Sequence, residues 1–187
     1  MSSKVIVVGS ANMDYVVRAD ALPGPGETLL GQSLRTFPGG KGSNQAVAAA
    51  RLGADVVFVG AVGDDADGAR MLRDLQADGV DTSEIDVRDD VATGIAQVTL
   101  LPGGENSILV VPGANAAVEP ARAVAAVRRH LRTDSIVVLQ GEVPHPVVEA
   151  VGLDAASAGA SVIVNLAPFF TPSDELLSVL DPLVVNQ

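Results

Sequence analysis

The segment Phe37-Pro38-Gly39-Gly40-Lys41-Gly42-Ser43-Asn44-Gln45-Ala46 carries the most informative local pattern of this chain, and an alanine-rich stretch ending at Gly53 follows it. Three glycines around a lysine allow the backbone to approach a ligand closely, because glycine has no Cβ and adopts positive φ at little cost. The alanine-rich stretch predicts a helix whose first turn holds Ser43 and Asn44. The start of a helix offers free N–H groups and a partial positive charge, which suits hydroxyls or an anion.

A simpler interpretation is a glycine turn that only leads into a helix. Lys41 argues for a binding role, because it is one of two lysines in the chain and its glycine neighbours leave it little to pack against. Familiar phosphate-binding patterns do not fit. The Walker pattern requires Gly at Arg35 and Ser or Thr at Gly42, and the dinucleotide fingerprint would place its third glycine at Gln45.

Composition limits the class of protein and of ligand. The chain has 187 residues, enough for one domain with a proper core. Apolar residues make up 48% and aromatic residues only 3%, which predicts a core of Val, Leu, Ala and Ile, as in α/β proteins. With 12 basic and 23 acidic residues the net charge is −11, which opposes binding to nucleic acid or to an anionic membrane.

The N-terminus and the cysteine content favour a cytoplasmic protein. The chain has no cysteine, so disulfides and thiolate metal sites are excluded. The apolar run after Lys4 is too short for a signal-peptide core, and no run approaches the roughly 20 residues of a membrane span. We therefore expect a soluble cytoplasmic protein with no membrane partner.

The first strand is predicted at residues 5–9, a continuous apolar run typical of a strand buried on both faces. Asn12 and Asp14 follow it. Two short polar side chains at the end of a buried strand are well placed to line a crevice. The alternative is an Asx turn, in which Asn12 or Asp14 caps local backbone.

Two turn-rich insertions, at about 15–37 and 93–111, interrupt the α/β pattern. The second has two apolar segments flanking Pro102-Gly103-Gly104-Glu105-Asn106, which predicts a hairpin. Together the insertions predict a small β-sheet that protrudes from the main domain, as a lid or as an interface.

The rest of the chain alternates strands with helices, which predicts a doubly wound, mainly parallel sheet. Residues 64–68 superficially resemble a calcium loop, but acidic residues are lacking at the required spacing, so we expect a turn with a helix cap. Strands are expected at 56–59, 135–140, 162–166 and from 183, and helices at 69–77, 119–132, 146–158 and 173–180.

Polar side chains follow several of these strands. In open α/β sheets ligands bind at the carboxyl edge. Each residue taken alone can be a capping group, but the set on one edge predicts a binding site. The set consists of Asn12, Asp14, Glu142, Asn165 and Asn186, with the loop 39–44 opening toward the same side.

These motifs resemble the ribokinase branch of the PfkB carbohydrate-kinase family, over essentially all 187 residues. The block Gly39–Ala46 is the most specific part of the resemblance. The other matching motifs are Gly9–Asp14, Pro25–Thr28, Gly63–Asp65, Thr93-Gly94, Pro112–Asn115 and the final Asn186.

The resemblance implies a sugar kinase that transfers the γ-phosphate of ATP, with Mg²⁺, to the primary hydroxyl of D-ribose or a similar pentose. It implies that Ala96 and Val98, on a lid hairpin, pack over the sugar and exclude water, and that two subunits form a homodimer through their lid sheets. It also implies that the hydroxyls of a furanose are hydrogen-bonded by Asn12, Asp14, Gly40, Lys41, Asn44 and Glu142, a mixture of donors and acceptors suited to vicinal hydroxyls.

The family pattern continues beyond this sequence. Members carry a later Gly-Ala-Gly-Asp segment that supplies the catalytic base, the anion hole and most of the ATP pocket, and a monovalent cation such as K⁺ is bound there. The motif that begins at Asn186 and helps to place magnesium and phosphate is cut after Gln187. We therefore expect the catalytic base and the C-terminal part of the fold to lie beyond Gln187, with Asn186 as a cofactor-binding residue.

Two alternatives remain. One is a complete, non-catalytic sugar-binding or dimerising protein. The other is a nucleoside kinase, or a kinase for another sugar, of the same family; Lys41 and Asn44 disfavour the nucleoside kinase.

Overall fold

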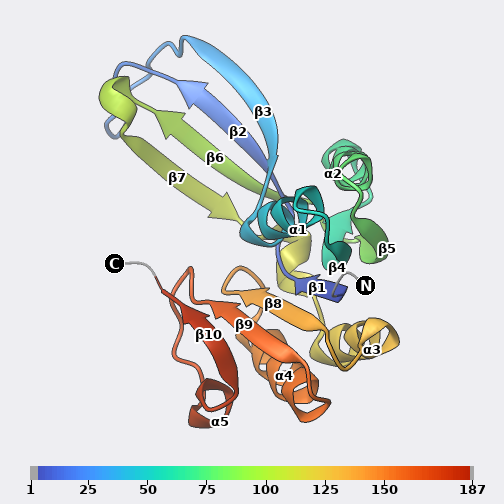
Figure 1. The fold of residues 1–187 in the computed structure, drawn as a ribbon. Coiled ribbons are helices and arrows are strands. Elements are labelled where there is room, and N and C mark those ends of the chain that lie inside the picture. The colour runs from blue at the N-terminus through green and yellow to red at the C-terminus, as the bar shows by residue number, and fades with distance from the viewer. Residues whose placement is uncertain (1–3, 186–187) are drawn as a thin grey trace.

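The structure is a computed structural model that describes residues 4–185. It is an α/β domain with a six-stranded parallel sheet and a separate four-stranded sheet that rises from one end of it (Figure 1). The predicted fold class is confirmed. Asn186, the predicted cofactor-binding residue, lies outside the described residues.

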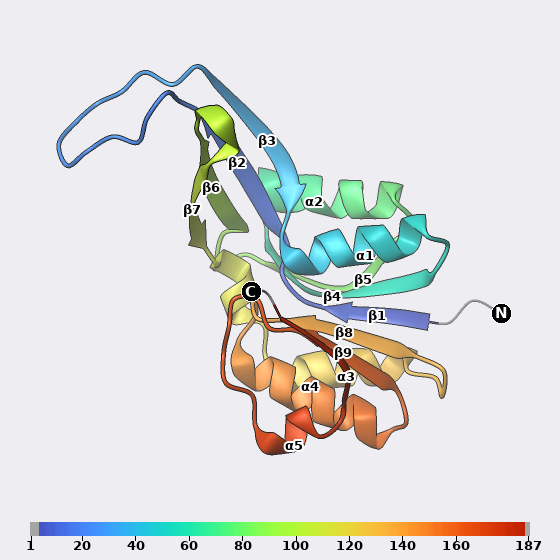
Figure 2. The ribbon, with the colours of Figure 1, turned by 60° about the vertical axis from the view of Figure 1, so that its left-hand side comes forward.

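The main sheet has the strand order β10-β9-β8-β1-β4-β5, and all its strand pairs are parallel. Helices lie on both of its faces, as Figure 2 shows, which makes the sheet doubly wound. The strands are β1 Lys4–Val8, β4 Asp55–Gly63, β5 Asp81–Arg88, β8 Ile136–Gln140, β9 Ser161–Asn165 and β10 Leu180–Val184. The helices are α1 Lys41–Arg51, α2 Ala66–Ala77, α3 Pro120–His130, α4 His145–Ser157 and α5 Asp174–Leu177, with a 3₁₀ turn η2 at Gly113–Ala117.

The core explains why the first strand is apolar throughout. Alternate side chains of a strand point to opposite faces. Val5 and Val7 pack with α1 and α2, whereas Ile6 and Val8 pack with α3 and α4. Each face thus buries its own cluster of Val, Leu, Ile and Ala, as the composition predicts.

The small sheet has the order β3-β2-β6-β7, built from β2 Asn12–Arg18, β3 Ser33–Gly39, β6 Gly94–Leu100 and β7 Asn106–Val111. Strands β6 and β7 form an antiparallel hairpin around the 3₁₀ turn η1, Pro102–Gly104, whereas β2 and β6 are parallel. The Tyr15 hydroxyl donates to Asp67 at 2.6 Å, and the Arg70 guanidinium donates to Thr36 at 2.7 Å. These bonds fasten one face of the small sheet to α2.

Asp65 confirms the predicted helix cap in the segment 64–68. Its carboxylate accepts from the Gly68 backbone N–H at 2.8 Å at the start of α2. The same carboxylate accepts from both the backbone N–H and the hydroxyl of Thr93, at 2.8 and 2.7 Å. The cap therefore also fixes the start of β6.

Two predictions about secondary structure were incomplete. Strand β5 was not predicted, because it is an edge strand in which the charged residues Glu84, Asp86 and Arg88 interrupt the apolar pattern. The helix expected at 173–180 ends at Leu177, and β10 begins at Leu180 rather than at 183. Pro182 disfavours a helical conformation at Asp181, so the chain becomes extended there.

Strand β10 forms the other edge of the main sheet and pairs only with β9. Leu183, Val184 and Val185 at this edge are 40, 41 and 60% exposed. Within residues 4–185, no helix has the length and apolar character needed to cross a bilayer.

Candidate functional site

The candidate site lies where the strand order of the main sheet changes direction. The chain proceeds from β1 to β4 and β5 on one side, and later returns to place β8, β9 and β10 on the other side. Ligands bind at such a switch point in open α/β sheets, beyond the carboxyl ends of the strands. Ser10 and Asn12 follow β1 there, and Glu142 follows β8.

The glycine loop approaches this point more closely than any side chain would permit. Gly40 has φ of 95°, and a Cβ at this position would lie 2.8 Å from the carbonyl oxygen of Ser10. A Cβ at Gly42 would lie 2.6 Å from the Ser10 backbone nitrogen. The predicted helix α1 begins at Lys41 beside the segment that follows β1 (Figure 2). The N–H groups of its first turn are already paired within the protein, since Gly42 donates to the Ser10 hydroxyl at 3.3 Å and Ser43 to the Ser10 carbonyl at 2.9 Å. The loop therefore does more than turn the chain.

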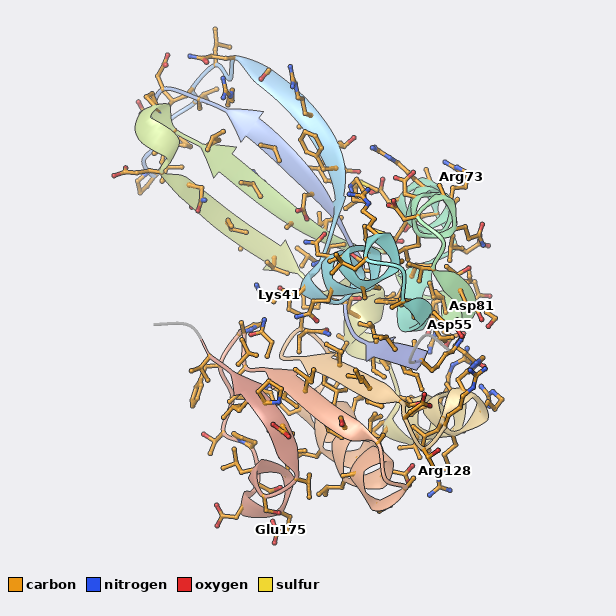
Figure 3. All side chains as sticks on the ribbon, in the orientation of Figure 1. Lys41, Asp55, Arg73, Asp81, Arg128 and Glu175 are labelled. Carbon is orange, nitrogen blue, oxygen red and sulfur yellow. The ribbon has the colours of Figure 1, made fainter. Side chains whose placement is uncertain are left out.

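Glu142 connects the three segments of the site. One carboxylate oxygen, Oε2, accepts from the Ser10 hydroxyl at 2.6 Å and from the Lys41 backbone N–H at 2.8 Å. The other oxygen, Oε1, lies 3.7 Å from the Lys41 ammonium. The carboxylate is thus held by neighbours from β1 and α1, and Oε1 remains available to accept a further hydrogen bond. Figure 3 shows Lys41 at the base of the small sheet.

Asp14 supplies a second acceptor. It lies in β2, and a Cβ at Gly39, on the neighbouring strand, would come within 2.3 Å of its carboxylate. Burial, and secondarily the negative charge of Glu142, raise the pKa of Asp14 above its ordinary value. The Asx-turn interpretation is wrong for both Asn12 and Asp14, because both belong to β2. Asn12 also accepts from the side chain of Asn115 at 2.7 Å.

The structure brings all the predicted sugar-contacting residues to one cavity of about 230 Å³. Its apolar wall is completed from β7 by Ile108 and Val110, which were not predicted as site residues. Val98 pairs with Ile108, and Ala96 with Val110, so the register of the hairpin is the signal that would have identified them. The predicted residues in this cavity are Asn12, Asp14, Gly40, Lys41, Asn44, Ala96, Val98 and Glu142.

Asn165 is not among the residues that line this cavity, although it also ends a parallel strand. Its side-chain Oδ1 is buried and makes no hydrogen bond among the described residues. Ser10 was not predicted as a site residue, because its contact with Glu142 spans 132 positions of sequence.

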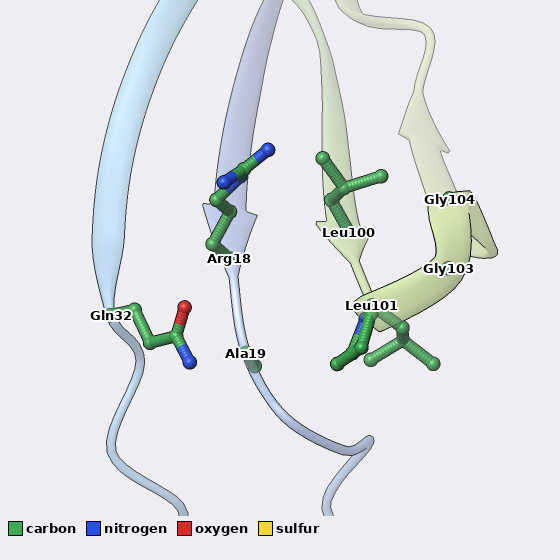
Figure 4. A pocket seen from close by; sticks show the side chains of 8 residues that line it. Arg18, Ala19, Gln32, Leu100, Leu101, Gly103 and Gly104 are labelled. Carbon is green, nitrogen blue, oxygen red and sulfur yellow. The ribbon is translucent and has the colours of Figure 1, made fainter.

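A second hollow, of about 360 Å³, lies at the far end of the small sheet (Figure 4). Its wall consists of Arg18, Gln32 and the turn from Leu100 to Gly104, together with Ala19. Arg18 is the one charged side chain there. The hollow lacks the convergent donors and acceptors of the smaller cavity, so we place the functional site at the strand ends.

Within residues 4–185, no three or more His, Cys, Asp or Glu side chains are grouped so that they could hold a metal ion. Glu142 lies beside the Lys41 ammonium and accepts from the Lys41 backbone N–H, and Asp14 lines the same cavity. This arrangement suits a neutral ligand with several hydroxyls.

Comparison with known proteins shows the family to which the chain belongs. Residues 2–187 match the family described as pfkB family carbohydrate kinase. The chain is 41% identical to the ribokinase of Bacillus subtilis, over 95% of this chain and 64% of that protein. It is 37% identical to the ribokinase of Haemophilus influenzae, over 100% of this chain and 61% of that protein.

A solved ribokinase structure is also similar to this chain. The structure of Arabidopsis thaliana ribokinase complexed with ribose and ATP matches with a TM-score of 0.86 and 35% identity, covering 99% of this chain and 60% of that one. The chain thus shares with this ribokinase its architecture, a doubly wound sheet with a small sheet beside its carboxyl edge. The chain belongs to the pfkB family of carbohydrate kinases. It spans less than two thirds of the length of these relatives.

Proposed function

We propose that the complete product of the gene that encodes this chain is an ATP-dependent ribokinase-like enzyme, which phosphorylates the primary hydroxyl of D-ribose or a similar pentose. The observation that carries the proposal is the convergence of eight residues, chosen from the sequence, on one small cavity. The ribokinases that match this chain at 37 and 41% identity support the choice of substrate. Because the reaction consumes ATP, we place the enzyme in the cytoplasm.

In this proposal the sugar is bound by groups of opposite hydrogen-bonding character. Asp14 and the free oxygen of Glu142 accept from hydroxyls, while Lys41 donates to sugar oxygens. Asn44 and the backbone of Gly40 complete the polar wall. Several such bonds fix the orientation of the sugar, which phosphoryl transfer requires, since its catalysis depends mainly on positioning and electrostatic stabilisation.

The small sheet, formed largely by the insertions 15–37 and 93–111, acts as a lid in this proposal. Its apolar side chains Ala96, Val98, Ile108 and Val110 line the cavity beside Asp14, which the same sheet carries. An apolar cover excludes water, which would compete with the sugar as phosphoryl acceptor.

We assign ATP, Mg²⁺ and an activating monovalent cation mostly to parts of the gene product outside this chain, with Asn186 at the border of that region. The shortness of the chain relative to its ribokinase relatives, at 64 and 61% of their length, supports this assignment. The catalytic base is assigned to the same outside region.

A coupled assay of ADP formation tests the function. The complete gene product should form ADP in the presence of D-ribose and should prefer free pentoses to nucleosides. The 187-residue chain alone should bind D-ribose without turnover. Ribose-dependent turnover by the 187-residue chain would refute the assignment of the catalytic groups, and a preference for nucleosides would favour the nucleoside kinase.

We also infer a homodimer that forms through the small sheet. Beyond the cavity, the face that carries Asp14 has apolar side chains such as Val16 together with the charged Arg18 and Arg35. Phe37 and Ile108 on this face are 45 and 54% exposed. On the reverse face of the hairpin, Gln97, Thr99 and Ser107 interrupt the apolar residues, although Leu109 is 65% exposed there. A second copy of the same sheet is the occupant that would cover an apolar face of this kind on both molecules at once.

Sedimentation of the complete gene product tests the dimer. Phe37→Ser should weaken dimerisation by at least about tenfold, because burying a phenylalanine contributes roughly 1.5–3 kcal/mol. Leu34→Ser is the matched control, since Leu34 lies on the reverse face of the same strand and is 61% exposed. Equal effects of the two substitutions would place the interface elsewhere.

A further inference from the structure

Asn115 belongs to a motif that the proposed function has not used. It lies in the turn η2, within Pro112-Gly113-Ala114-Asn115, and is only 1% exposed. A buried carboxamide costs free energy unless its donors and acceptor are paired. The hydrogen bonds of its side chain join it to Ala11 and Asn12, which follow β1, and to Pro112 in its own turn. This pattern indicates a role at the end of β1.

The hydrogen bonds of Asn115 fix the orientation of its own amide. Its Oδ1 lies 2.9 Å from the backbone nitrogen of Ala11, which can only donate. Its Nδ2 is therefore on the opposite side, where it lies 3.0 Å from the carbonyl oxygen of Pro112 and 2.7 Å from Asn12 Oδ1. Because the carbonyl of Pro112 can only accept, the two backbone groups together leave one consistent assignment of oxygen and nitrogen.

This assignment determines the orientation of Asn12 as well. Asn12 must turn its Oδ1 toward the Nδ2 of Asn115. The Nδ2 of Asn12 has no hydrogen-bond partner within residues 4–185, and it is not among the buried unpaired atoms of that range. Asn12 lines both the 230 Å³ cavity and a neighbouring hollow of about 340 Å³ that shares Val110 and Glu142 with it, so this free amide N–H group is available to a ligand at this edge of the sheet.

We propose that Asn115 is a positioning residue that holds Asn12 with its N–H group directed at the sugar. The inference rests on the proposed function for the identity of the ligand. Asn12 then supplies a donor on the same side as the acceptors Asp14 and Glu142. A sugar oxygen that faces Asn12 accepts a hydrogen bond, and its own proton is free to be donated to a neighbouring acceptor.

Gly94 provides independent support for this arrangement. A Cβ at Gly94 would lie 2.3 Å from Asn115 Nδ2 and 2.3 Å from Asn12 Oδ1. The start of β6 is therefore shaped around the hydrogen bond between the two amides. This close contact explains why glycine follows Thr93 in a strand, where glycine is otherwise unfavourable.

A double-mutant cycle tests the positioning role in the complete gene product, with D-ribose affinity measured by calorimetry. Asn12→Ala and Asn115→Ala should each weaken binding by about tenfold, the effect of losing one hydrogen bond. The double variant should bind no more than about twofold more weakly than the weaker single variant. Multiplied effects of the two substitutions would show that Asn115 does not act through Asn12, and would overturn the proposal.

The isosteric variant Asn12→Asp tests the polarity. One carboxylate oxygen can still accept from Asn115, but the other would present an acceptor where the proposal requires a donor. D-Ribose affinity should fall by about tenfold to a hundredfold. The thermal midpoint should fall as well at pH 7, because the new carboxylate is buried and lines the same cavity as Asp14 and Glu142. Unchanged affinity would mean that Asn12 presents oxygen to the sugar, contrary to the proposal.

Ser135→Ala is the control for a purely structural loss. Ser135 is as buried as Asn115 and accepts one hydrogen bond, from the Arg132 backbone at 2.8 Å, before β8 begins and away from the cavity. This variant should lower the thermal midpoint and leave ribose affinity unchanged. A similar loss of affinity in Ser135→Ala would reduce Asn115 to a general stabilising residue.

A measurement without sugar separates this proposal from the proposed function. The through-hydrogen-bond coupling in NMR should connect the side-chain nitrogen of Asn115 with the side-chain carbonyl carbon of Asn12. The reverse coupling, from Asn12 nitrogen to Asn115 carbon, would overturn the orientation. If the coupling is as expected but the wild-type protein binds no pentose, the choice of ligand fails and the orientation of Asn12 stands.

Discussion

Replacing Asp14 is expected to remove sugar binding while stabilising the fold at neutral pH. In Asp14→Ala the affinity for D-ribose should fall by at least about a hundredfold. A hydrogen bond to a charged group contributes roughly 1.5–3 kcal/mol, and hydroxyls left without their acceptor add a further loss. Titration calorimetry on the complete gene product measures the effect. Unchanged affinity would exclude Asp14 from the site.

The stabilising effect follows from the raised pKa of Asp14, which burial and the charge of Glu142 cause. A carboxyl group with a higher pKa in the folded state binds protons more tightly there than in the unfolded chain. Its contribution to stability is therefore present below the unfolded pKa, about 3.9, and is lost as the pH rises through the folded pKa. The Asp14→Asn variant has no carboxyl group at this position and does not lose stability in this way. Its thermal midpoint should therefore exceed that of the wild type, and by more at pH 7 than at pH 4.

Asp90→Asn is the matched control for this pH dependence. Asp90 is exposed, and the neighbouring Arg88 lowers its pKa, so the sign of its effect is opposite. Asp90→Asn should leave ribose affinity unchanged and should not raise the thermal midpoint at pH 7. Two carboxylates that are held close together repel each other. We therefore expect this site to bind its ligand at the expense of stability.

The main sheet could be predicted from the sequence because burial on both faces leaves a simple signal. The run Val5–Val8 has no polar residue, and a glycine separates each of the helices α1, α2 and α4 from the next strand. Strand β5 lacked this signal. Its charged residues Glu84, Asp86 and Arg88 lie at the edge of the sheet, where they are tolerated and oppose pairing with other chains.

Site residues could be predicted where the residue type and its position at a strand end are sufficient evidence. They could not be predicted where contacts between residues far apart in the sequence determine their position. Resemblance to a family and the position of strand ends indicated Asp14 and Glu142. The bonds that hold Glu142 to Ser10, and Asn12 to Asn115, join residues 132 and 103 positions apart. Only the fold brings such partners together, and no local pattern specifies them.

The second large effect is expected at Gly42, where helix α1 rests on the end of β1. A Cβ at this position would lie 2.6 Å from the Ser10 nitrogen and 2.8 Å from the Cα of Gly9. These are backbone atoms, so no side chain can rotate away. Gly42→Ala should gain about 1 kcal/mol of helix propensity, but the overlap requires the helix or the strand to move. Such overpacking costs typically 1–3 kcal/mol and occasionally more.

We expect the overlap to dominate, so the free energy of unfolding of Gly42→Ala should fall by about 2 kcal/mol, which is roughly 4–8 °C in thermal midpoint for a protein of this size. Moving α1 also separates the Lys41 N–H from Glu142, so D-ribose binding should be lost together with stability. Gly24→Ala is the control, because a Cβ there makes only an ordinary contact, 3.5 Å from Glu27. A Gly42→Ala protein with wild-type midpoint and affinity would show that the close contact between α1 and β1 is not required to build the site.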